Sequence, residues 1–136
     1  MGDMKETAAR FYEVLRAGDL AGLTALTQEF ATDDFIDEYP QSGERITKAG
    51  AIELAEKYGE MTGTSPTFSY RRMFGGDDHF VVEATIDYGD GVPVSYVGIG
   101  ELRDGKIAHM TEYFANPFDA PAWRAAFVEQ PEPVKA

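Results

Sequence analysis

Four extended segments separated by glycine-containing turns make up the second half of the chain, and they constrain the fold more than any other feature. Within them, apolar and polar side chains alternate, most regularly in the second segment, which is the period of a strand with one buried face. The intervening Gly-Gly-Asp-Asp, Gly-Asp-Gly and Asp-Gly stretches are turn and hairpin signals. The sequence therefore predicts strands at residues 67–74, 80–88, 92–102 and 106–114.

Helical spacing dominates the first half instead. Apolar residues recur every three or four positions in residues 4–17, in a second segment that Asp19 can cap, and in a third, 49–58, that Thr47 can cap. A short strand is expected at 35–40, and a short closing helix over 117–128. Helices followed by a long, mainly antiparallel sheet predict an α+β domain.

Length and charge narrow the class of protein. The chain has 136 residues and no cysteine, so we expect a single domain over residues 4–128 and a flexible tail over 129–136. Its net charge of −12 disfavours binding to nucleic acid or to anionic membranes. The two histidines are dispersed, and no metal site or cofactor motif is recognisable. We expect a cytoplasmic protein without a metal or cofactor.

Strand alternation indicates which side chains face inward. In the second strand, one face carries the apolar residues Phe80, Val82, Ala84, Ile86 and Tyr88. The third strand places Tyr96, Gly98, Gly100 and Leu102 on one face, where two glycines let the sheet bend or make room for a ligand. In the last strand, alternation alone leaves open whether the face with Met110, Glu112 and Phe114 or the face with His109 points inward.

Several segments resemble one family. Residues 10–20 are similar to the opening helix and turn of SnoaL-like proteins and ketosteroid isomerases, which belong to the nuclear-transport-factor-2-like superfamily. Residues 34–40 resemble their first strand, and 102–107 with 112–114 resemble their closing hairpin. The resemblance implies a cone-shaped, strongly curved sheet, mixed or antiparallel, wrapped over three N-terminal helices, with a pocket inside it, and a homodimer. It also implies that Asp37, Tyr39, Gly98, Met110, Glu112 and Phe114 face the cavity.

The chain departs from the isomerases at their catalytic positions. Where those enzymes carry a tyrosine, an aspartate base and an aspartic acid, the matching residues are Phe11, Tyr39 and Gly98. Steroid isomerisation by that mechanism is therefore not expected. In SnoaL-like polyketide cyclases an acid on the last strand serves as the base, and Glu112 lies near that position.

Glu112 is the first candidate catalytic residue, because a carboxyl group in an apolar cavity can move protons near neutral pH. The alternative is a solvated or arginine-paired Glu112. Asp37 is a candidate partner acid or, alternatively, an exposed residue of an acidic run, and Tyr39 is a candidate hydrogen-bond donor. The expected substrate-binding residues are Phe11, Leu15, Tyr58, Val82, Ala84, Ile86, Tyr96, Gly98, Met110 and Phe114.

Two functions remain open. One is an enzyme without a cofactor, an isomerase, cyclase or lyase, acting on a hydrophobic carbonyl or polycyclic substrate. The other is a non-catalytic, dimeric module that binds a small apolar ligand. A third reading assigns a partner or homodimer interface to the outer sheet face, which includes His109.

Overall fold

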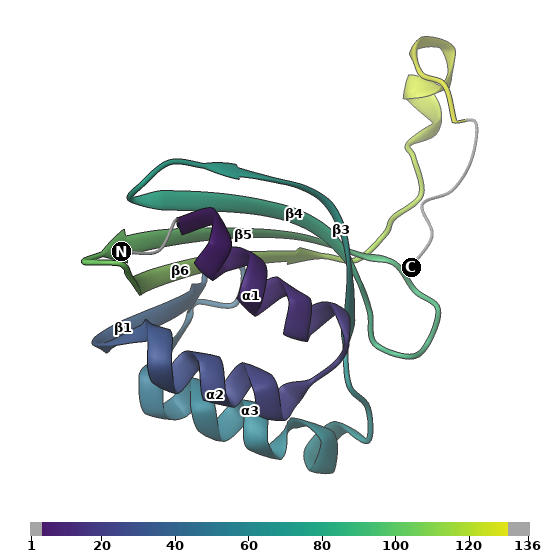
Figure 1. Ribbon diagram of the computed structural model, residues 1–136. Helices are drawn as coiled ribbons and strands as arrows, with labels where there is room; N and C mark the ends of the chain where they lie inside the picture. Colours follow the sequence, from purple (N-terminus) through teal and green to yellow (C-terminus); the bar gives the residue numbers. More distant parts are fainter. Residues whose placement is uncertain (1–3, 131–136) are drawn as a thin grey trace.

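The computed structural model describes residues 4–130, so most of the expected tail at 129–136 lies outside the described residues. Helices and strands follow one another along the chain as in Figure 1. They are α1 (Met4–Arg16), α2 (Leu20–Phe30), β1 (Ala31–Tyr39), β2 (Glu44–Thr47), α3 (Lys48–Thr62), β3 (Thr67–Gly75), β4 (His79–Asp87), β5 (Val94–Arg103), β6 (Lys106–Ala115) and the 3-10 helix η1 (Ala122–Phe127).

The strands form one six-stranded sheet in the order β2-β1-β6-β5-β4-β3. All neighbouring pairs are antiparallel except β1 and β6, which run parallel, so the sheet is mixed. The sheet does not close, and it curves over the three α-helices, which lie on one of its faces (Figure 1). The expected α+β class and curved sheet are confirmed, and of the two expected types, mixed and antiparallel, the sheet is mixed.

Side chains cap the helices where the sequence predicts. The backbone N–H of Gly22 donates to Oδ1 of Asp19 at 2.9 Å, and the backbone N–H of Gly50 donates to Oγ1 of Thr47 at 3.1 Å. Both bonds satisfy a donor that the first turn of a helix leaves unpaired. Gly63, in the left-handed region with φ of 74°, ends α3.

Three expectations need correction. Strand β1 begins at Ala31 rather than Phe35, and β2 was not foreseen, because its four residues lack a buried face. The closing helix over 117–128 is a six-residue 3-10 helix whose residues are not buried, so it does not close the domain. Pro121, the residue directly before this helix, has an extended backbone conformation.

The core lies between the sheet and the helices. The alternation predicted for β4 is confirmed, since Phe80, Val82, Ala84 and Ile86 are all buried. On β5, a Cβ added at Gly100 would lie 2.2 Å from the ring of Phe80. Gly100 is therefore a packing requirement and not space for a ligand.

A bulge in β3 breaks the expected alternation at two arginines. Because the register with β4 shifts between Tyr70 and Arg72, both Arg71 and Arg72 are exposed. Both approach Glu83, at 3.9 Å and 2.6 Å. Neither arginine neutralises Glu112, so that possibility is excluded.

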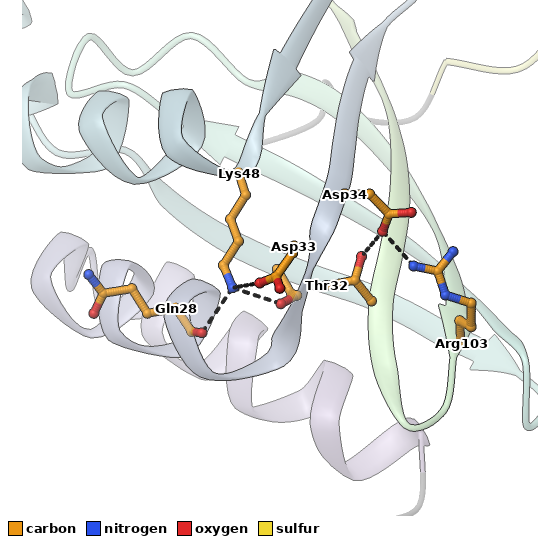
Figure 2. A network of polar contacts seen from close by, with 7 residues as sticks. Gln28, Thr32, Asp33, Asp34, Lys48 and Arg103 are labelled. Atoms are coloured by element: carbon orange, nitrogen blue, oxygen red, sulfur yellow. Dashed lines mark hydrogen bonds and ion pairs between the residues drawn. The ribbon is translucent and has the colours of Figure 1, made fainter.

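Polar contacts of Lys48 join three elements at the start of β1 (Figure 2). Its Nζ donates to the carbonyls of Gln28 at 3.1 Å and Ala31 at 2.9 Å, at the carboxyl end of α2. Nearby, Arg103 donates to Asp34 (Figure 2). These contacts fix the start of the strand that carries Asp37.

None of the helices within residues 4–130 is both long and apolar enough to cross a bilayer.

Candidate functional site

A cavity of about 220 Å³ lies between the concave face of the sheet and the helices. Side chains from α1, α2 and α3 form one wall, and strands from both halves of the sheet form the other. Its surface is predominantly apolar, and the only ionisable carboxyl groups among its lining residues are those of Asp37 and Glu112. The aromatic lining consists of Phe11, Tyr12, Phe35, Tyr39, Tyr58, Phe68, Phe80, Tyr88, Tyr96 and Phe114.

The parallel pairing of β1 and β6 brings the two acids together. Asp37 lies beside Met110 in the register, and Glu112 is two residues further along β6, on the same face. The side chain of Asp37 is buried, with 9% of the residue exposed. Within the described residues, its Oδ1 has no hydrogen-bond partner. The alternative of an exposed Asp37 in an acidic run is thereby excluded.

Glu112 is held by a tyrosine on the neighbouring strand. The hydroxyl of Tyr96 donates to Oε1 of Glu112 at 2.5 Å. Tyr96 itself is almost fully buried, with 1% exposed. Glu112 is therefore neither paired with an arginine nor fully solvated. Its other oxygen, Oε2, does not accept the hydrogen bond from Tyr96.

Burial is the main cause of unusual protonation in the cavity. It raises the pKa of Asp37 far above its usual value, and the nearby negative charge of Glu112 raises it further. A hydrogen bond from Tyr39 acts in the opposite direction but is the weaker influence. Asp37 therefore keeps its proton at neutral pH and can donate a hydrogen bond.

Two tyrosine hydroxyls meet above Gly98, which lies opposite Glu112 in the register. A Cβ at Gly98 would lie 2.4 Å from the Tyr96 hydroxyl and 2.9 Å from the Tyr12 hydroxyl. The hydroxyl of Tyr96 has one proton, which it donates to Glu112. In the contact between the two tyrosines, the hydroxyl of Tyr12 is therefore the donor and the oxygen of Tyr96 is the acceptor. Burial, and then Glu112, raise the pKa of Tyr12, Tyr39 and Tyr96, so all three stay protonated.

Tyr39 and Phe114 stand at the end of the cavity where β1 and β6 finish. Their rings pack edge to face with centroids 5.3 Å apart. Both are partly exposed, whereas Ala31 and Ile107, which line the opposite end, are buried. The cavity thus opens at the carboxyl ends of β1 and β6.

Residues 8–110 match the family described as SnoaL-like domain. The chain belongs to the SnoaL-like family. An NTF2-like protein of unknown function from Burkholderia xenovorans LB400 is similar in structure, with 35% identity, 93% of this chain and 94% of that chain covered, and a TM-score of 0.73. No curated protein matches the chain.

Two further solved structures share the SnoaL-like fold at lower identity. One is a candidate ketosteroid isomerase from Kribbella flavida DSM 17836, with 20% sequence identity to this chain and a TM-score of 0.79. The match covers 96% of this chain and 90% of that chain. A candidate SnoaL-like polyketide cyclase from Jannaschia sp. CCS1 has 19% identity, 82% and 84% coverage, and a TM-score of 0.68. At these identities the likeness concerns the fold.

Most of the residues predicted for the site line the SnoaL-like cavity. They are Phe11, Leu15, Asp37, Tyr39, Tyr58, Tyr96, Met110, Glu112 and Phe114. Val82, Ala84 and Ile86 face the same side of the sheet and are buried in the core, but they do not line the cavity, so they are not substrate-binding residues. The space above Gly98 holds the two tyrosine hydroxyls, so it is not open to a ligand.

Tyr12 is the residue that sequence reasoning missed. Its helical spacing marked it only as a packing position, whereas its hydroxyl lies in the polar centre of the SnoaL-like site. A tyrosine on the same helical face as Ala8 and Leu15 was the available signal.

His109 lies on the other face of the sheet, as alternation opposite Glu112 requires. Its Nδ1 is 2.8 Å from Glu101, and its Nε2 is 3.4 Å from Glu38. It takes no part in the cavity. Among the described residues, no group of three or more His, Asp or Glu side chains is arranged to hold a metal ion.

Proposed function

We propose that the chain is an acid–base enzyme, an isomerase, cyclase or lyase that moves a proton on a hydrophobic carbonyl or polycyclic substrate without a cofactor. The observation that carries the proposal is the pairing of a buried, protonated Asp37 with Glu112 on the wall of an apolar cavity. A carboxyl group that keeps its proton, beside a second carboxyl group that can accept one, supplies both a donor and a base in one site.

Each group has a distinct role in this reaction. Oε2 of Glu112 takes a proton from the carbon next to the substrate carbonyl, and the C–H electron pair moves into the new C=C bond as the carbonyl oxygen becomes negative. The O–H of Asp37 donates a hydrogen bond to that oxygen, and Tyr39 is a second donor beside it. Glu112 then returns the proton to the substrate, at the same carbon or at another.

The surroundings support this division of roles. Tyr96 fixes the orientation of Glu112, and the aromatic lining excludes water from the developing charge. The candidate isomerase and candidate cyclase with the same fold are named for reactions of this type.

Hydrogen–deuterium exchange into 2-tetralone tests the proposal without knowledge of the natural substrate. In D₂O the protein should accelerate exchange next to the carbonyl above the rate in buffer, as followed by NMR. Glu112→Gln should slow this exchange about 10²–10⁴-fold. Asp37→Asn should slow it about 10²–10³-fold, because a donor to the oxyanion is replaced by a weaker one.

Two matched variants control for the loss of charge alone. Glu101→Gln removes a glutamate from the outer face of β5, and Asp33→Asn removes an exposed aspartate from β1. Both should keep the wild-type rate. Binding of 2-tetralone without any acceleration of exchange, or unchanged exchange in Glu112→Gln, would contradict the proposed enzyme and favour the non-catalytic binding module.

A further inference from the structure

The cavity carries negative charge that its own lining does not balance. Asp37 and Glu112 are its two carboxyl groups, and none of the residues within 4–130 that line it is a lysine, arginine or histidine. The buried Oδ1 of Asp37 has no hydrogen-bond partner among the same residues, which is the mark of a site built for a ligand. The missing cation indicates which charge on that ligand the cavity favours.

Three aromatic side chains stand at the open end of the cavity. We call Tyr58, Tyr88 and Phe114 the mouth ring; all three line the cavity and are half-buried. Tyr88 directly follows β4, which runs in the same direction as β6 because β5 is antiparallel to both, so the two strands end on the same side of the sheet. Thr64, just after α3, donates to the carbonyl of Tyr88 at 2.8 Å, which ties the end of the helix that carries Tyr58 to this opening.

The mouth ring lies within the electric field of Glu112. Burial, followed by the neighbouring Tyr58 and then by Glu112, raises the pKa of Tyr88 to about 12. Burial also raises the pKa of Tyr58, so both tyrosines present uncharged rings at neutral pH. The face of such a ring attracts a cation, and a nearby carboxylate adds to the attraction. An anion at the same place is repelled by Glu112 and by the net charge of −12.

We propose that the substrate of this site is a small amino ketone, whose protonated amine packs against the mouth ring while its carbonyl group binds Asp37 and Tyr39. The placement of the carbonyl group rests on the proposed function. A cation on the ring faces leaves Oε2 of Glu112 free to act as the base, and its charge stabilises the negative oxygen that forms. The cavity volume of about 220 Å³ lies below the range of drug-sized pockets, which fits a substrate with a single small ring.

Three ketones that share a cyclohexanone ring test the preference for charge. At neutral pH 4-(dimethylamino)cyclohexanone is a cation, 4-isopropylcyclohexanone has the same shape without charge, and 4-oxocyclohexanecarboxylate is an anion. Deuterium exchange next to the carbonyl is followed by NMR, and each rate is divided by its rate in buffer. The cation should exceed the neutral ketone about 2–30-fold in kcat/KM, and the anion should be the slowest. An equal or reversed order overturns the proposal.

Salt separates the mouth ring from the charge of the whole molecule. The same rates are measured in about 0.05 M and about 0.5 M salt, which shortens the reach of surface charges to a few ångströms. The preference for the cation should persist at the higher salt. A preference that disappears there would come from the net charge of −12 alone and would contradict binding at the mouth ring.

Two variants of Tyr58 test the aromatic contact at one position. Tyr58→Phe keeps the ring face, whereas Tyr58→Leu keeps an apolar side chain without a ring. The ratio of the cationic to the neutral rate should fall about 2–5-fold in Tyr58→Leu and stay near the wild-type ratio in Tyr58→Phe. Equal ratios in the two variants, with circular dichroism showing both folded, would remove the mouth ring from substrate binding.

A cation placed in the cavity should reverse the preference. Leu54 lines the cavity from α3 and is 41% exposed, so Leu54→Lys can carry its charge at the opening. This variant should favour the anionic ketone over the cationic one. Met61→Lys makes the same change of net charge on α3, at a 76% exposed side chain outside the cavity lining, and should keep the wild-type order. An unchanged order in Leu54→Lys contradicts the proposal.

Calorimetric binding of the three ketones separates this inference from the proposed function. Tightest binding of the cation without any exchange would keep the preference for positive charge and overturn the enzyme. Accelerated exchange of the neutral ketone, with no advantage for the cation in binding or rate, would keep the enzyme and overturn the amino ketone as its substrate.

Discussion

Gly98 shows how a single missing side chain organises the site. It faces the cavity side of β5, directly across from Glu112, and the hydroxyls of Tyr96 and Tyr12 fill the space that a Cβ would need. The sequence suggested that this glycine makes room either for bending or for a ligand. In the structure this room is taken by the hydroxyl of Tyr96, which donates to Glu112, and by the neighbouring hydroxyl of Tyr12.

Gly98→Ala should therefore destabilise the protein and disturb Glu112 together. The added methyl group would lie 2.4 Å from the Tyr96 hydroxyl, so that ring must move. We expect a loss of about 1–3 kcal/mol in the free energy of unfolding, measured with urea.

Gly59→Ala is the matched control for this prediction. Gly59 lies in α3 and has no atom within 4 Å of an added Cβ. Alanine there should stabilise the helix by about 0.5–1 kcal/mol. If Gly98→Ala were as stable as Gly59→Ala, the crowding above Gly98 would not hold the hydroxyls in place.

At this scale, the sequence predicts which residues face inward better than what they do there. The alternation of apolar and polar residues predicts the buried face of β4, and the family resemblance predicts that Asp37 and Glu112 face the cavity. Alternation says nothing about the distance between strands that are remote in sequence, however. The burial of Asp37 follows from the parallel pairing of β1 with β6, which no local pattern encodes.

Among the elements, the junction of α2, β1 and α3 positions Asp37, one member of the acid pair. The Nζ of Lys48 binds the carbonyl of Gln28, in the last turn of α2, where it lacks a partner in the helix, and the carbonyl of Ala31, the first residue of β1 (Figure 2). The side chain is largely buried. This lysine therefore stabilises the turn from α2 into the strand that carries Asp37.

Lys48→Met should cost about 1–3 kcal/mol of stability, because it keeps the apolar stem but removes the ammonium donor from the carbonyl groups of Gln28 and Ala31. Lys57→Met is the comparison, since Lys57 makes only an exposed pair with Glu53 on α3. That change should cost at most about 0.5 kcal/mol. Equal effects in thermal or urea unfolding would remove the structural role given to Lys48.

The elements that sequence reasoning missed share a physical cause. Strand β2 buries no face of its own, so its four residues carry no alternating pattern, and pairing with β1 alone makes them a strand. The bulge at Tyr70 and Arg72 changes the face of every later residue in β3. The helices and hairpins were predictable because caps and glycine turns are local signals.

For the whole molecule, the raised pKa of Asp37 links stability to pH. Unfolded, this carboxyl titrates near 3.8, whereas the folded chain keeps the proton to much higher pH. Between these values the native state binds more protons than the unfolded state, so the contribution of Asp37 to stability falls as pH rises. It is most favourable at acidic pH, below the unfolded pKa.

Asp37→Asn removes this titration. Each pH unit over which only the native state holds this proton is worth about 1.4 kcal/mol. Relative to wild type, the variant should therefore gain about 5 kcal/mol in the free energy of unfolding between pH 4 and pH 8. Urea unfolding at both pH values measures the change. Asp33→Asn, at an exposed position of the same strand, should show no such trend. A constant difference between wild type and Asp37→Asn would mean that Asp37 is ionised in the folded protein.

In the cavity, the carboxyl group of Asp37 is uncharged at neutral pH, while the neighbouring Glu112 accepts a hydrogen bond from Tyr96. Infrared spectroscopy at pH 7 observes this state directly. We expect a C=O stretching band of a protonated carboxyl group in wild type and in Asp33→Asn, and its loss in Asp37→Asn. A wild-type spectrum with carboxylate bands alone would contradict it.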